Sequence, residues 1–225
     1  MTQHATEEDA WDAYGDGSQA RLWDRDPTRF HWTQWTGHPN HGPQLELLPT
    51  GPGTSVLDLG CGKGRNLFHI AARGGRAVGV DLSGNQITAA RALSGVRMEL
   101  HQADAAAFLD TCPEEFDAVY SVFGAVWFTD PGVLLPKILR RLKPGGVLVF
   151  SHRPPENGEY GPVLHGEEAP AMRWCYPDAV WESHLRAFGF VDVASWIIAP
   201  PPGKEGMVQT VLVRGTRPTT PQGPS

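Results

Sequence analysis

The chain has 225 residues, enough for one domain of ordinary size with a sizeable core. Its net charge is -6 with a pI near 5.8, and no block of like charge exceeds a few residues, which disfavours nucleic acid and anionic membranes as partners. The N-terminus lacks the basic and apolar regions of a secretory leader, and no apolar run approaches the ~18 residues of a membrane helix. The three cysteines, Cys61, Cys112 and Cys175, have neither metal-ligand nor redox-pair spacing. We therefore expect a cytoplasmic protein with reduced cysteines.

Residues 1–50 differ from the rest of the chain in their aromatic content. They contain half of the eight tryptophans and three histidines: Trp11, Trp23, Trp32, Trp35, His31, His38 and His41. Short helices are predicted over 6–14, 18–25 and 44–48. We expect this segment to form an aromatic-rich helical cap.

From Ser55 onward the periodicity alternates between strand and helix. The predicted strands are 55–58, 76–80, 96–101, 116–121 and 146–151, and the predicted helices are 64–73, 84–93, 104–110, 131–141 and 178–188. Such alternation predicts right-handed crossovers and a parallel sheet covered on both faces. Two later strands, 191–199 and 207–214, are joined by PPPGKEG, which is too short for a crossover helix, so they should pair antiparallel.

The most informative segment is VLDLGCGKGRN, in which an apolar run ends in Asp58 and is followed by Gly60, Gly62 and Gly64. Glycine lets a backbone turn with positive φ and lets a ligand approach closely. The pattern alone is also typical of a simple tight turn. The next predicted strand ends in Asp81, about twenty residues on, where an α/β fold places an acid for two ribose hydroxyls. Together these features predict a site for an adenosyl-type cofactor.

The sequence resembles the class I S-adenosylmethionine-dependent methyltransferases. The resemblance covers roughly residues 54–215 and lies in an ordered series of segments: VLDLGCGKG, VGVDLS, QADAAAF, FDAVYSVFGAVWF and LKPGGVLVFS. It implies an α/β, Rossmann-like fold: a seven-stranded, mostly parallel sheet with an antiparallel last strand and helices on both faces. The methyltransferase domain would span 51–215, after the N-terminal helical cap, with an acceptor-side insertion at 153–176 and a disordered tail at 216–225. The implied cofactor is S-adenosyl-L-methionine, with S-adenosyl-L-homocysteine as product.

The same resemblance assigns cofactor contacts by position. The methionine end would be held by Asp58 and by the backbone of Gly60, Cys61 and Gly62. Asp81, followed by Leu82, would bind the ribose, Asp104 and Ala105 the adenine, and Ser121 and Val122 would lie near the sulfonium. Two alternatives stay open: Asp104 is also suited to cap the following helix, and Asp58 could tie down the glycine turn internally.

Acceptor-side residues should come from the carboxyl edge of the sheet and from whatever covers it. The candidates are Tyr14, His31, Trp32, Trp35, His38, Phe123, Trp127, Arg153, Trp174 and Tyr176. His152 is the candidate general base, because it follows a central strand and histidine titrates near neutral pH. Alternatively, His152 only hydrogen-bonds the loop through Pro154. No metal is expected, because no further ligand accompanies the His38-x-x-His41 spacing.

The motifs of several methyltransferase subtypes are missing. The segment after the fourth predicted strand lacks the Asn/Asp-Pro-Pro-aromatic motif of enzymes that methylate adenine or glutamine, and the chain lacks the Pro-Cys nucleophile and the acidic metal cluster of other subtypes. We expect N- or O-methylation of a small molecule, in secondary-metabolite biosynthesis by analogy, by a monomer or homodimer. Two alternatives are a sensor or accessory subunit that binds the cofactor without catalysis, and a nicotinamide-dependent oxidoreductase.

Overall fold

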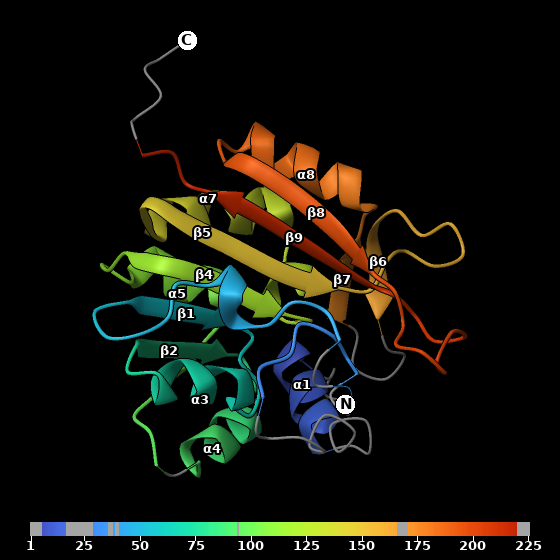
Figure 1. Cartoon of the computed structure of the whole chain (residues 1–225). Helices are drawn as coiled ribbons and strands as arrows, with labels where there is room; N and C mark the ends of the chain where they lie inside the picture. Colours follow the sequence, from blue (N-terminus) through green and yellow to red (C-terminus); the bar gives the residue numbers. More distant parts are fainter. Residues whose placement is uncertain are drawn as a thin grey trace.

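The computed structural model of the chain describes residues 6–16, 29–35, 38, 41–93, 95–165 and 171–219. These residues form a seven-stranded sheet in the order β3-β2-β1-β4-β5-β9-β8 (Figure 1). The strands are β1 Ser55–Leu59, β2 Arg76–Asp81, β3 Glu99–Gln102, β4 Phe116–Val122, β5 Leu142–His152, β8 Val191–Ile198 and β9 Thr210–Thr216. The predicted fold class is confirmed.

The direction of the strands also follows the prediction. Strand β1 pairs in parallel with β2 and β4, and β4 pairs in parallel with β5. Strand β9 lies between β5 and β8 and is antiparallel to both. The connection between β8 and β9 is a loop, as its length requires.

Helices cover both faces of the sheet. One face carries α3 (Arg65–Ala72), α4 (Gly84–Arg91) and the 3-10 helix η2 (Leu45–Leu47). The other carries α5 (Ala105–Thr111), α7 (Pro131–Arg141) and α8 (Asp178–Ala187). Successive residues of a strand point to opposite faces, so Val119 of β4 packs in the second layer while Tyr120 packs with Phe30 and Trp32 in the first. This burial on both faces explains the nearly continuous apolar character of the central strands.

Several predicted elements differ from the structure. The N-terminal helix α1 spans Glu7–Asp16, and the predicted 44–48 helix is only the single turn of η2. The predicted helix 18–25 lies outside the described residues. The strand predicted over 96–101 begins only at Glu99 in the structure, where β3 first pairs with β2. Within the 153–176 insertion, β6 (Gly161–His165) and β7 (Ala171–Cys175) form an antiparallel hairpin that the sequence analysis missed, as it missed the short helix α6 (Ala125–Phe128).

The predicted tail 216–225 begins too early. Thr216 is the last residue of β9 and pairs with Val147, and the amide of Arg217 donates to the carbonyl of Gly146. The Arg217 guanidinium also contacts Glu115 at 2.7 Å. The start of this segment is therefore part of the sheet, and residues 220–225 lie outside the described part of the chain.

The carboxyl ends of β1, β2 and β4 meet at one edge of the sheet, and α1 lies across that edge (Figure 1). Open α/β sheets bind ligands at this edge. In the parts of the chain that the structure describes, we find no helix with the length and apolar character needed to span a membrane.

Candidate functional site

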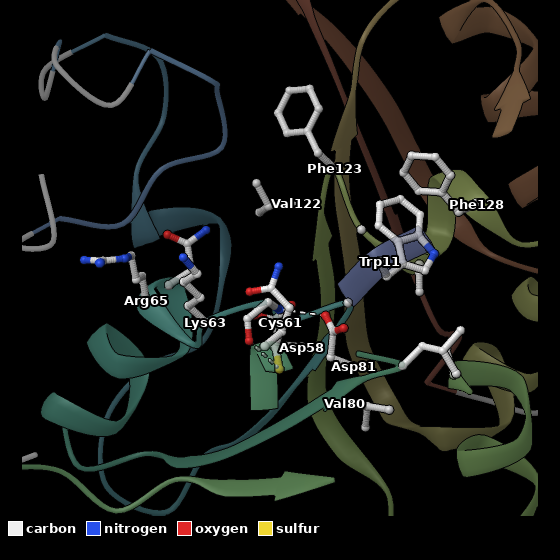
Figure 2. A pocket seen from close by; sticks show the side chains of 18 of the residues that line it. Trp11, Asp58, Cys61, Lys63, Arg65, Val80, Asp81, Val122, Phe123 and Phe128 are labelled. Atoms are coloured by element: carbon white, nitrogen blue, oxygen red, sulfur yellow. Dashed lines mark hydrogen bonds between the residues drawn. The ribbon is translucent and has the colours of Figure 1, made fainter. Parts of the chain in front are cut away.

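A cleft opens at the carboxyl edge of the sheet. Its walls come from the turn after β1, the ends of β2 and β4, the turn before α5, and α1 (Figure 2). The open space amounts to about 1410 Å³, part of which merges with solvent. The cleft is therefore bounded by several separate segments of the chain and stays open to solvent.

The glycine turn forms one wall, and two of its glycines serve different purposes. Gly60 (φ 81°) and Gly62 (φ 51°) both have backbone conformations that favour glycine. A Cβ at Gly60 would sit 2.6 Å from the backbone nitrogen of Ala125, whereas one at Gly62 would meet no atom within 4 Å. The amides of Gly60 and Cys61 both donate to the carbonyl of Val80, which fixes the turn on β2. Gly60 is thus needed for packing, while Gly62 leaves space on the cleft side.

Asp58 places a buried carboxyl at the cleft, with only 3% of its surface exposed. Burial raises its pKa to about 8; the nearby Tyr120 hydroxyl lowers the pKa, and the charge of Asp81 raises it. The Tyr120 hydroxyl nevertheless makes no hydrogen bond of ordinary geometry. Among the described residues, no basic side chain forms an ion pair with Asp58. A cation bound in the cleft would lower the Asp58 pKa and ionise it.

Asp81 is held in place by two backbone amides. Its Oδ2 accepts from the amide of Gly62 at 2.8 Å, and its Oδ1 accepts from the amide of Ser83 at 3.0 Å. Burial raises its pKa, while these two hydrogen bonds oppose the shift. Each carboxylate oxygen can accept a second hydrogen bond. The carboxylate is therefore oriented and still able to accept from ligand hydroxyls.

Asp104 caps a helix and also lines the cleft. Its carboxylate accepts from the amide of Ala107 at 2.8 Å, which confirms the capping alternative. Asp104 and Ala105 line the cleft together with Leu82. Asp58 lies near the end of β1, Asp81 ends β2 and Asp104 follows β3, and the structure brings all three to one cavity.

At the end of β4, Val122 and Phe123 line the cleft but Ser121 does not. The Ser121 hydroxyl is buried; it donates to the carbonyl of Leu59 at 2.7 Å and accepts from the amide of Val126 at 3.3 Å. The predicted contact of Ser121 is therefore wrong, because its hydroxyl ties β1 to α6 instead. Phe123 has φ 48°, a strained conformation for a residue with a Cβ, which places its ring at the cleft.

His152 is not at the cleft, and the prediction that it is the base is wrong. The residue is 0% exposed and its ring stacks between Trp127 and Phe150, with Trp181 beside it. Its Nδ1 donates to the carbonyl of Arg153 at 2.6 Å, close to the alternative interpretation. Burial lowers its pKa to about 4, so the ring is neutral at neutral pH. Because side chains alternate along β5, His152 points to the α8 face and α6 separates it from the cleft.

Of the predicted acceptor residues in the N-terminal segment, the structure brings only His31 to the cleft among those it describes. Trp32 is in the core, where its Nε1 donates to the carbonyl of Gln44 at 2.8 Å. Trp35 is buried against the ring of His41, and the amide of His38 bonds to the carbonyl of Trp35. The side chain of Tyr14 lies outside the described residues.

Apart from Phe123, which lines the cleft, the other predicted acceptor residues lie behind the cleft or away from it. Trp127 is buried behind Phe123, with ring centroids 6.2 Å apart. The Arg153 guanidinium donates to the side chain of Gln34 at 3.0 Å. Trp174 and Tyr176 stack on one another, and Tyr176 also contacts Trp181. The aromatic side chains therefore pack against one another and leave no open acceptor pocket between the rings that the structure describes.

Sequence reasoning missed part of the lining. The missed residues include Glu7, Trp11, Arg29, Lys63, Arg65, Asn66, Gln86, Phe128 and Thr129. Figure 2 shows the rings of Trp11 and Phe128 next to one another on the Asp81 side of the cleft, with centroids 4.5 Å apart. Trp11 was noted only for its residue type, and nothing in the local sequence places α1 at the sheet edge.

Comparison with known proteins identifies the domain. Residues 56–146 match the profile of the family described as "Methyltransferase domain". The trans-aconitate 2-methyltransferase of Azoarcus sp. (strain BH72) is 35% identical over 150 residues, which are 59% of this chain and 58% of that protein. The chain spans about half the length of the curated relatives it matches.

Solved structures give the same result for the fold. A protein of Haloferax volcanii, solved with the Trm112 methyltransferase activator, superposes with a TM-score of 0.63 at 25% identity, over 92% of this chain and 97% of that one. The 1,6-didemethyltoxoflavin-N1-methyltransferase of Burkholderia thailandensis, solved with bound S-adenosylhomocysteine, has a TM-score of 0.56 at 22% identity, over 75% of this chain and 72% of that one.

The expected domain and the expected fold are confirmed. Residues 56–146 are a methyltransferase domain, set in the fold of the class I S-adenosylmethionine-dependent methyltransferases. The cofactor expected for such a domain is S-adenosylmethionine, which carries a cationic ammonium and a ribose diol. The described residues fit this group, since they offer a buried carboxyl without an ion pair, an oriented acceptor carboxylate and open space at Gly62. No group of three or more potential metal ligands occurs among them.

Proposed function

We propose that this protein transfers the methyl group of S-adenosylmethionine to the nitrogen or oxygen of a small-molecule acceptor. The observation that carries the proposal is the convergence of Asp58, Asp81 and Asp104 on one cleft. The matched methyltransferase domain supports the reaction type. A role in secondary metabolism is part of the proposal.

We assign the cofactor contacts as follows. Asp58 pairs with the ammonium group, and the backbone of Gly60, Cys61 and Gly62 holds the methionine chain. Asp81, beside Leu82, accepts from the ribose hydroxyls, and Asp104 and Ala105 hold the adenine. Val122 lies beside the sulfonium. Charge-assisted bonds of the kind proposed for Asp58 and Asp81 are roughly twice as strong as neutral ones.

The cofactor supplies an activated methyl group, so the chain contributes mainly orientation and exclusion of water. Val122 and the ring of Phe123, which line the cleft, would contact the acceptor. His31 lines the cleft and takes the place of His152 as the candidate to accept a proton from a hydroxyl acceptor. An amine acceptor only has to lose a proton and needs no such base.

The acceptor is further proposed to be a small organic acid. The cleft is lined by four acids, Glu7, Asp58, Asp81 and Asp104, of which the three aspartates are assigned to the cofactor. It is also lined by three basic residues, Arg29, Lys63 and Arg65, which would attract an anionic acceptor. The matched Azoarcus relative is named for an acid, trans-aconitate. Paired panels of acids and their neutral amides or esters test this class, with the acids expected to be methylated faster.

Methyl transfer itself is tested with radiolabelled S-adenosylmethionine and small-molecule extracts of the source organism. We expect label in the small-molecule fraction, and less of it with Asp81→Ala. Binding of S-adenosylhomocysteine without any transfer would favour the sensor or accessory-subunit alternative. Tight NADH binding without S-adenosylhomocysteine binding would favour the oxidoreductase. Light scattering tests the proposed monomer or homodimer.

A further inference from the structure

Helix α1 contributes to the cleft although it lies outside the segment that matches the methyltransferase domain. Its residues Glu7 and Trp11 line the cleft, and the Trp11 ring packs edge-on against Phe128 at 4.5 Å. Figure 2 shows this pair on the side where Asp81 lies. Helix α1 therefore covers the part of the cleft assigned to the nucleoside.

Two side chains attach α1 to the body of the domain. The Asp12 carboxylate accepts from the Ser83 hydroxyl and, at 3.2 Å, from the amide of Asn85, the second residue of α4. One turn earlier, Glu8 accepts from the side chain of Gln102 at 2.8 Å. Asp12 itself does not line the cleft, so any effect of Asp12 on a ligand is indirect and acts through the position of α1 or through Ser83 and Asp81.

Ser83 connects this attachment to the ribose carboxylate. The residue is 0% exposed, and its amide donates to Asp81 at 3.0 Å while its hydroxyl contacts Asp12. The same hydroxyl accepts from the amide of Gln86 and caps α4. The buried Ser83 thus hydrogen-bonds to the carboxylates of both Asp12 and Asp81.

The two carboxylates also interact through their charges. The charge of Asp12 contributes to raising the pKa of Asp81, behind the larger effect of burial. Hydroxyl groups that donate to Asp81 would spread its charge and reduce this repulsion. A ribose diol at Asp81 therefore favours the arrangement in which Asp12 stays docked at Ser83.

We propose that Asp12 and Ser83 are positioning residues that couple the docking of α1, and with it the Trp11 cover of the cleft, to cofactor binding at Asp81. The proposal rests on the proposed function, because it requires the cofactor in this cleft. By linkage, the cofactor stabilises the docked helix as much as the docked helix strengthens cofactor binding.

The test measures S-adenosylhomocysteine binding by calorimetry. Asp12→Ala removes both accepted bonds, and we expect the Kd to rise about tenfold, within the usual range of such coupling. Asp12→Asn keeps the Oδ1 acceptor and removes the charge beside Asp81, so its Kd should equal that of the wild type or be slightly lower. Asp9→Asn is the charge-matched control, because among the described residues the Asp9 carboxylate hydrogen-bonds Thr6 of the same segment and does not line the cleft.

Hydrogen exchange of the α1 peptide gives a second readout, which can be made in the wild type and in Asp12→Ala. Saturating S-adenosylhomocysteine should slow exchange over α1, and Asp12→Ala should reduce this slowing. An unchanged Kd in folded Asp12→Ala, or α1 exchange that ignores the ligand, would overturn the coupling and leave the proposed function intact. Failure of the wild type to bind S-adenosylhomocysteine would overturn both.

Discussion

The two halves of the cleft region follow from the sequence to very different degrees. The glycine turn and the three acids lie at strand ends, and the structure gathers them as predicted. The aromatic residues expected on the acceptor side instead form a filled cluster around His152. Positions next to strand ends are fixed by the sheet, whereas the direction and cover of aromatic side chains depend on distant packing. The glycine turn and the three acids therefore allow functional assignments, whereas the aromatic cluster around His152 contributes mainly to the stability of the fold.

The largest effect is expected for Gly60→Ala. Its Cβ would lie 2.6 Å from the backbone of Ala125, in a left-handed conformation. We expect a loss of about 4 kcal/mol in the free energy of unfolding. Gly62→Ala is the matched variant, because it meets only open space; it should cost about 1–2 kcal/mol. Urea denaturation and calorimetry measure both. Equal destabilisation by the two variants would contradict the separate purposes of the two glycines.

His152→Ala tests the second half. The variant removes a ring packed between Trp127 and Phe150, and we expect the free energy of unfolding to fall by about 3 kcal/mol through the cavity left behind. Turnover per folded molecule should stay unchanged. His31→Gln is the comparison at the cleft, where we expect slower turnover with little loss of stability. A strong loss of turnover in folded His152→Ala would contradict this account and indicate that His152 takes part in catalysis.

Asp81→Ala tests the first half through binding. The variant removes the carboxylate proposed to accept from the ribose, and we expect S-adenosylhomocysteine binding to weaken by roughly 1.5–3 kcal/mol. Calorimetry at constant pH measures the change. The Asp9→Asn variant, which lies away from the cleft, serves as control. Wild-type affinity in Asp81→Ala would remove this residue from the cofactor site.

For Asp58→Asn we expect a smaller change in the free energy of unfolding, and one that depends on pH. The folded-state pKa of about 8 lies above the ordinary value of 3.8, so between these values the folded protein binds more protons than the unfolded chain. The Asp58 contribution therefore stabilises the fold at low pH and is lost as pH rises through about 8. Asparagine resembles the protonated acid. Urea denaturation should find that the stability advantage of this variant over the wild type grows as pH rises from about 4 to about 8, and is larger by about 1 kcal/mol or more at about pH 9 than at about pH 4. An identical pH profile would contradict the raised pKa.

The limits of sequence reasoning show in particular residues. Asp81 was placed by its distance from the glycine turn, and Asp104 by its place before a helix. Ser121 and Val122 are adjacent, but strand alternation turns only Val122 to the cleft, and the sequence does not say which face the cleft adjoins. Trp11 lines the cleft from a helix whose Asp12 contacts Ser83, a pairing of residues 71 positions apart that no local pattern predicts.

A crystal structure with S-adenosylhomocysteine tests the central assignment most directly. We predict the ribose hydroxyls at Asp81, the adenine beside Asp104 and the amino group at Asp58, with the sulfur facing Val122. A ligand bound elsewhere, or one whose ribose and amino group contact neither Asp81 nor Asp58, would contradict it.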